Sequence, residues 1–220
     1  DDKDSYELAL EASLRAVQMA KENDPDFSEN QLAIVISGGS TPDFVYPACA
    51  CRLQGALLGS KHAEAFDISL ACSSGIASLN IIGSRMRDMG YRYGLVAIGE
   101  SIGTRSNAPT SLNYTLWGNM GGAFVVRFDP EGDPRYGLFA DRILSDGQYA
   151  DWTRSVGIGA HPSNANAVRF ASMEGHEKDI HRYGSRNVPS VLKQFLADCE
   201  VSGNVYLFPH NSNLKMMINI

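Results

Sequence analysis

The sequence predicts an α/β fold in which parallel strands alternate with crossover helices. Continuous apolar runs of strand length occur at 32–36 and 94–98, and a third short apolar run stops at Cys72. Helical patterns cover 4–22 and 48–58, and another follows Cys72. Strands covered on both faces are unbroken apolar runs, whereas amphipathic helices repeat apolar residues every three or four positions. The strand–helix–strand order therefore favours a parallel sheet with helices on its faces.

The later part of the chain is expected to add antiparallel strands, a loop and a further helix. Two consecutive strand patterns separated by a turn rich in Asp and Pro favour the antiparallel addition. Gly184 and Pro189 interrupt the last long helical pattern, which predicts a break or two pieces. The predicted elements are strands at 121–128, 138–144 and 205–208, a surface loop at 145–166 and a helix at 175–198.

Composition narrows the class of protein. The 220 residues are 44% hydrophobic and 20% charged, as in an ordinary globular protein. A net charge of −6, without a dense run of Lys or Arg, disfavours a nucleic-acid partner. No apolar run is long enough to span a bilayer, and the first residues lack the layout of a signal peptide. We therefore expect neither a membrane nor secretion.

The cysteines point to a reducing compartment. Cys49, Cys51, Cys72 and Cys199 are too sparse for a disulfide scaffold, so the cytoplasm is the simpler setting. The C-x-C pair Cys49 and Cys51 has no further ligands nearby, which makes a metal site improbable.

Cys72 is the first candidate for chemistry. It is expected at the end of a strand that turns directly into an amphipathic helix, so its sulfur would lie near a helix N-terminus. Free backbone N–H groups and the helix dipole there stabilise a thiolate and lower a cysteine pKa. The alternative is a small buried residue, because free cysteine is often buried.

His210 occupies the same kind of position as Cys72, directly after a predicted strand and before a predicted helix start. In open α/β sheets, ligands collect at the carboxyl ends of strands, so the two side chains are expected to meet there. A cysteine and a histidine far apart in sequence but close in space suit covalent catalysis. The alternative for His210 is a hydrogen bond to nearby backbone.

Four motifs together carry a family resemblance. They are Ser40–Gln54, Phe66–Gly75, Trp117–Ala123 and Phe208–Leu214. In this order and spacing they resemble the thiolase-fold condensing enzymes, and among these β-ketoacyl-acyl carrier protein synthase III. The resemblance implies a thiolase-like fold, with layered mixed sheets and buried helices.

The same resemblance implies how the chain divides. Residues 1–130 would form the later part of an N-terminal half that carries the nucleophile, and 131–220 the start of a C-terminal half that carries the histidine. The family's first and last segments, including its catalytic asparagine, would lie before Asp1 and after Ile220.

The resemblance also implies site residues and partners. Cys72 would take an acyl group from a thioester of coenzyme A or of acyl carrier protein, and His210 would polarise the thioester of a malonyl-type partner for decarboxylative condensation. Trp117 and Asn213 would contact the substrate. Tyr46 would reach across a homodimer interface, or else pack locally in its loop. No cofactor is implied.

Departures from the family pattern leave alternatives open. Gly118–Ala123 reads Gly-Asn-Met-Gly-Gly-Ala where the family usually has Gly-Asp-Gly-Ala-Gly-Ala. The arginine that precedes this motif in relatives and stacks on coenzyme A has no counterpart, which favours a carrier-protein donor. Acyl transfer to a hydroxyl or amine, a hydrolase, and a non-catalytic partner subunit are the alternatives.

Overall fold

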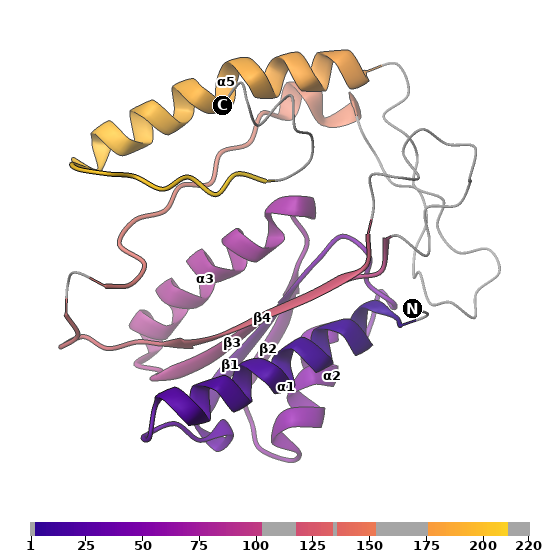
Figure 1. Cartoon of the computed structure of the whole chain (residues 1–220). Coiled ribbons are helices and arrows are strands. Elements are labelled where there is room, and N and C mark those ends of the chain that lie inside the picture. Colours follow the sequence, from indigo (N-terminus) through magenta and orange to yellow (C-terminus); the bar gives the residue numbers. More distant parts are fainter. Residues whose placement is uncertain (1–2, 103–117, 134–135, 153–175, 211–220) are drawn as a thin grey trace. The chain divides into compact units, whose positions relative to one another are not determined.

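The structure, a computed structural model, describes residues 3–102, 118–133, 136–152 and 176–210 of the chain. They form two compact units, which meet in the sequence between 133 and 136 and are described separately. The first unit contains α1 (Ser5–Asn23), η1 (Glu29–Gln31), β1 (Leu32–Gly38), α2 (Cys49–Leu58), β2 (Glu64–Ile68), η2 (Ala71–Ser73), α3 (Ser74–Met89), β3 (Tyr93–Glu100) and β4 (Met120–Arg127) (Figure 1). The second contains η4 (Gly147–Trp152) and α5 (Glu177–Asp198).

The first unit is built on one mixed sheet with the strand order β2-β1-β3-β4. β1 pairs in parallel with β2 and β3, and Val35 lies opposite Ala65 on one side and Leu95 on the other. β4 pairs antiparallel to β3, with Val125 opposite Leu95. The predicted parallel pairing is therefore confirmed. The antiparallel partner of β4 is β3, whereas the sequence analysis expected 121–128 to be followed by an antiparallel strand at 138–144.

Helices cover both faces of this sheet. Figure 1 shows α1 and α2 on one face and α3 on the other. Alternate residues of β1 face opposite sides: Val35 packs with the α1 and α2 side chains, and Ile34 and Ile36 pack with Ile82 and Met86 of α3. Because both faces are covered, the strand is apolar from Leu32 to Ile36, as its sequence indicates.

The helix ends follow local signals. Asp4 caps α1 in a reciprocal capping box with Glu7, which satisfies backbone donors of the first turn. α3 ends at Gly90, whose φ of 69° lies in the left-handed region that glycine adopts without a Cβ clash. α1 therefore begins and ends within one residue of the predicted range 4–22, and α3 follows Cys72 as predicted.

Two strand predictions in the second unit are wrong. Neither 138–144 nor 205–208 is a strand among the described residues, and their large side chains are mostly exposed, Phe208 to 91%. A β-rich segment becomes a strand only when a neighbour pairs with its backbone, and in the described part of this unit neither segment is paired. The predicted halves 1–130 and 131–220 stay a prediction.

The prediction of a broken last helix is also wrong. α5 is one continuous helix that includes both Gly184 and Pro189. A proline inside a helix removes one backbone hydrogen bond. The intact turns on either side of Pro189 keep the remaining residues helical.

Candidate active site

The candidate site lies at the carboxyl edge of the sheet. β1 ends at Gly38, β2 at Ile68 and β3 at Glu100, and their parallel pairing brings these ends together. Cys72 follows β2 by four residues, so it lies beyond this edge. The placement agrees with the rule that parallel sheets bind ligands at the carboxyl ends of their strands.

The turn that carries Cys72 differs from the prediction. The strand stops at Ile68 rather than at Cys72, and Cys72 is the middle residue of the 3₁₀ turn η2, directly before α3. The preceding residue, Ala71, has a φ of 48°, which costs a non-glycine residue about 1–2 kcal/mol. Strain of this kind persists only where surrounding contacts hold it, and it concentrates at functional sites.

Contacts on both sides hold this turn. The hydroxyl of Ser74 accepts a hydrogen bond of 2.9 Å from the backbone N–H of Leu70, which closes the turn around Cys72. The start of α3 also packs tightly on the end of β1, because a Cβ added at Gly38 would lie 3.0 Å from both Ser74 Cβ and Ser78 Oγ. Glycine at position 38 therefore lets α3 approach the sheet edge.

Glu100 is a site residue that the sequence analysis did not identify. Its carboxylate accepts hydrogen bonds from the Ser40 backbone N–H, from Ser40 Oγ at 3.0 Å and from Thr41 Oγ1 at 2.5 Å. The signal was an acidic residue at the end of a buried apolar run. It was missed because the apolar run stops at 98, whereas β3 continues to Glu100.

The pKa of Cys72 is raised, opposite to the expected direction. Partial burial of the thiol is the largest cause, and the negative charge of Glu100 adds to it, whereas the Cys72 backbone N–H acts in the opposite sense. The residue remains exposed to solvent. Cys72 lies within η2, two residues before the first residue of α3, and the backbone N–H that lowers its pKa is its own.

Asp43 anchors the loop that follows β1. Its carboxylate accepts hydrogen bonds from the backbone N–H groups of Ser5 and Tyr6, at 3.1 and 2.9 Å. Arg52 forms an ion pair of 3.4 Å with Asp43 and stacks over the Tyr6 ring at 3.6 Å. This network links α1, α2 and the loop at the same edge of the sheet as Cys72.

Tyr46 lies in this loop and is 83% exposed. The phenol therefore does not pack within its own unit, so the alternative of local packing does not hold there. Its predicted reach into a partner subunit stays a prediction.

The remaining predicted site residues are distributed as follows. His210 belongs to the second unit, where it is exposed after an extended segment. The units are described separately, so its approach to Cys72 stays a prediction. Trp117 and Asn213 lie outside the described residues.

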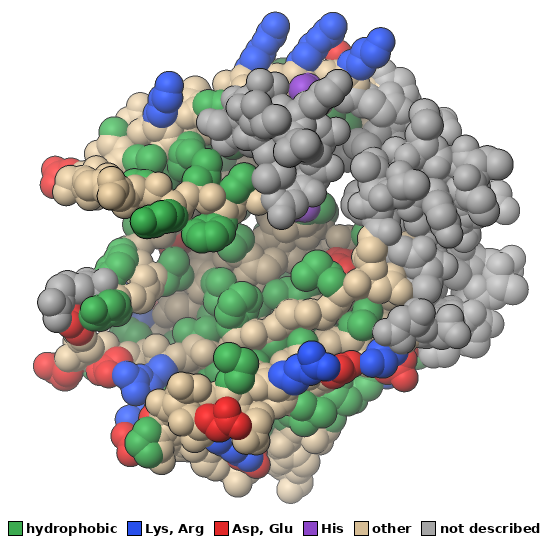
Figure 2. Space-filling view, viewed as in Figure 1, with side chains coloured by type: hydrophobic (Ala, Val, Ile, Leu, Met, Phe, Trp, Pro, Cys, Tyr) green, Lys and Arg blue, Asp and Glu red, His purple; other side chains and the backbone are tan. Residues whose placement is uncertain are grey.

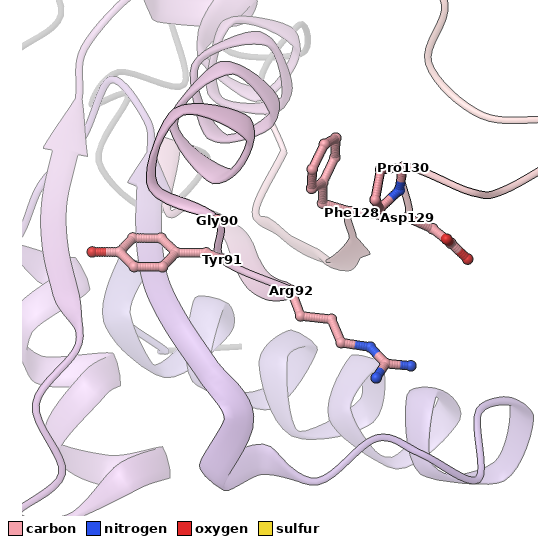
Figure 3. Close-up of a pocket in the computed structure, with 6 residues that line it drawn as sticks. All are labelled: Gly90, Tyr91, Arg92, Phe128, Asp129 and Pro130. Carbon is pink, nitrogen blue, oxygen red and sulfur yellow. The ribbon is translucent and has the colours of Figure 1, made fainter.

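The cleft drawn in Figure 3 lies at the other end of the sheet. It has a volume of about 460 Å³ and is lined by Gly90, Tyr91, Arg92, Phe128, Asp129 and Pro130, at the start of β3 and the end of β4. Tyr91 points away from Phe128, and its hydroxyl is bound to Glu64 at 2.9 Å. The two charged side chains that line it, Arg92 and Asp129, form ion pairs with Asp26 at 3.1 Å and with Arg127 at 3.3 Å.

Two other kinds of site find no support in the described part of the chain. It contains no group of three or more His, Cys, Asp or Glu side chains placed to hold a metal ion. None of its helices combines the length and the apolar character needed to span a bilayer.

The chain is similar in sequence to curated proteins of one kind. The chain is 26% identical over 218 residues to β-ketoacyl-acyl carrier protein synthase III of Sphingopyxis alaskensis, covering 98% of this chain and 64% of that one. It is 29% identical over 224 residues to the synthase III of Alkalilimnicola ehrlichii, covering 98% and 65%. No family model matches.

A solved structure gives the same result. The chain superposes on 3-oxoacyl-acyl carrier protein synthase III of Pseudomonas aeruginosa with a TM-score of 0.78 and 26% identity, covering 99% of this chain and 64% of that one. The chain is similar to these synthases along nearly its whole length. The resemblance and the thiolase-like fold predicted from the motifs are therefore confirmed. The chain spans 64–65% of the length of these relatives.

Proposed function

We propose that this chain carries the nucleophile of an acyl-transferring condensing enzyme. The observation that supports this most strongly is Cys72, placed on a strained turn at the carboxyl edge of the sheet in a chain similar to synthase III over 98% of its length. The curated relatives are named as β-ketoacyl-acyl carrier protein synthases, which suggests an acyl thioester as substrate.

In the proposed first step the Cys72 sulfur attacks the carbonyl carbon of an acyl thioester. A new sulfur–carbon bond forms and the old one breaks, and the donor leaves as a thiol with the proton that Cys72 loses. A thiolate suits this exchange because it is both a good nucleophile and a good leaving group.

In the proposed second step a malonyl-type thioester loses CO₂, and the resulting enolate carbon attacks the acyl group on Cys72. The Cys72 sulfur leaves as a thiolate, which takes up a proton from solvent to regenerate the thiol, and a 3-oxoacyl thioester is released. His210 would stabilise the developing enolate oxyanion by a hydrogen bond, which acts most strongly when the charge appears in the transition state.

An intact-protein mass spectrum tests the first step. Exposure to acyl-coenzyme A or acyl-carrier protein should add one acyl mass, which Cys72→Ala abolishes and Cys51→Ala, at an exposed free thiol, preserves. No adduct with either donor would contradict the proposal. With a malonyl-type partner added, a 3-oxoacyl product supports condensation, whereas an ester or amide product would indicate transfer to a hydroxyl or amine.

The proposed carrier-protein partner finds support on α5. Lys178, Arg182, Arg186 and Lys193 are all exposed, and their spacing places them on one face of the helix. Figure 2 shows Lys and Arg side chains projecting from the surface over α5. Only Arg182 has an acidic partner among the described residues, Asp179 at 3.5 Å.

These four side chains form a cationic stripe on α5, although the chain as a whole has a net charge of −6. A stripe of this kind complements a protein surface rich in carboxylates. Changing Lys178, Arg186 and Lys193 together to Glu should slow acyl loading from the carrier protein by roughly tenfold or more at low salt. Loading from acyl-coenzyme A should remain unchanged. The control changes Lys61 and Arg87, two exposed cations of the first unit, to Glu. An equal loss with both donors would argue against docking on α5.

We also propose that the protein works as a cytoplasmic homodimer. All four cysteines are free thiols, which suits a reducing compartment. Exposed Tyr46 suits a contact with a second copy. Light scattering of the native protein should give twice the chain mass, and Tyr46→Ser should weaken the dimer. A monomer at micromolar concentration would contradict this assignment.

A further inference from the structure

We propose that Glu100 is a positioning residue for the Cys72 nucleophile. Its carboxylate fixes the loop Gly39–Thr41, and this loop contacts the chain on both sides of the turn that carries the thiol. The inference rests on the proposed function only for the role of Cys72 as nucleophile. The relationship between the carboxylate and the thiol can be measured without any acyl donor.

Three hydrogen bonds hold the carboxylate in place. One oxygen accepts from both the backbone N–H and the hydroxyl of Ser40, and the other accepts from the Thr41 hydroxyl at 2.5 Å. Hydrogen bonds to an ionised acceptor are shorter and stronger than neutral ones. Both carboxylate oxygens are therefore directed into the loop, and the charge has a fixed position at the end of β3.

The loop lies between Glu100 and the two sides of the Cys72 turn. A Cβ added at Gly39 would lie 3.2 Å from the Glu100 carboxylate, and the Gly39 N–H donates to the carbonyl of Ile68, which ends β2, at 3.2 Å. The neighbouring Gly38 packs against Ser74, at the start of α3. A shift of this loop would therefore act on Ile68, ahead of the turn, and on Ser74, directly after it.

The electrostatics agree with this geometry. Among the described residues, Glu100 is the one charged side chain that acts on the Cys72 thiol, and its charge raises the pKa of that thiol. A like charge disfavours the thiolate because the two anions repel. A thiolate reacts faster with alkylating agents than a thiol does, so the Glu100 charge should slow alkylation of Cys72.

The pH dependence of Cys72 alkylation tests the proposal. Iodoacetamide labelling, followed residue by residue by peptide mass spectrometry, should show a lower midpoint pH in Glu100→Gln. Alkylation at neutral pH should be roughly threefold faster or more. The matched control is Glu64→Gln, which removes the same charge from the opposite end of β2, where Glu64 binds Arg85. Its alkylation profile should match that of the unaltered protein.

A second variant separates the charge from the loop contacts. Glu100→Asp keeps the charge but is too short to reach both Ser40 and Thr41, so acyl loading of Cys72 should fall while the alkylation midpoint stays near that of the unaltered protein. Thermal unfolding checks that each variant is folded. A Glu100→Gln midpoint that is unchanged or higher, or an equal shift in Glu64→Gln, would overturn the proposal. If the unaltered protein takes up no acyl group at all, that result would instead contradict the proposed function.

Discussion

The Asp67 carboxylate, at the end of β2, accepts a hydrogen bond of 2.8 Å from the backbone N–H of Ala50, in the first turn of α2. Its second oxygen accepts from the Cys49 N–H at 2.7 Å. α2 has no side-chain cap of its own, because Ala48 occupies the N-cap position. A residue 17 positions further along the chain therefore caps this helix.

Removal of this cap should destabilise the first unit. Asp67→Ala leaves two helix N–H groups without their acceptor, and we expect the free energy of unfolding to fall by about 1–2 kcal/mol. Asp67→Asn keeps one acceptor oxygen and should recover part of the loss. Urea unfolding followed by circular dichroism measures both. An Asp67→Ala protein as stable as the original would show that water replaces the cap at no cost.

Gly99 should tolerate no side chain. A Cβ at this position would lie 1.8 Å from the backbone oxygen of Ser5, where α1 crosses β3, so Gly99→Ala should destabilise the protein by several kcal/mol or prevent folding. Gly55→Ala is the control, because it lies inside α2 with no atom within 4 Å of the added Cβ. Helix propensity predicts that it raises stability by up to about 1 kcal/mol. The melting temperature should therefore fall in Gly99→Ala and rise in Gly55→Ala, relative to the unaltered protein.

Cys49 should make the protein less stable at alkaline pH. Burial, with Asp67 and Asp43 nearby, raises its pKa from 9.0 to about 11. Between these values the unfolded chain loses the thiol proton while the folded chain keeps it, so ionisation favours unfolding. The free energy of unfolding should therefore fall as pH rises above 9, by up to about 1.4 kcal/mol per pH unit.

Urea unfolding at pH 8, 9 and 10 measures this slope. Cys49→Ala should reduce it, whereas Cys51→Ala, at an exposed neighbour, should retain it. Equal slopes in the two variants would show that other groups cause the alkaline loss.

His210→Ala should separate the two proposed steps. Acyl loading of Cys72 should persist, because the thioester exchange does not require the imidazole to hold the enolate. Condensation with the malonyl-type partner should fall by about 10²–10³-fold, the usual cost of losing one oxyanion donor. Adduct mass and product formation are measured on the same sample. Unchanged condensation would remove His210 from the proposed mechanism.

Sequence patterns predicted the first unit well, because its signals are local. The apolar run of β1 and the Gly90 stop of α3 each depend on residues close in the chain. The strands expected at 138–144 and 205–208 failed for the opposite reason. Strand propensity says nothing about whether a partner strand is available, and pairing decides the outcome.

The sequence alone determined that Cys72 lies between a strand and a helix and that four ordered motifs resemble synthase III. Tertiary structure alone decided the environment of that sulfur. Thr41 and Glu100 are 59 positions apart, yet they meet beside the Cys72 turn because β1 and β3 are parallel neighbours. Burial and a fixed charge arise from such long-range contacts, so the direction of the thiol pKa was not evident from residues near Cys72.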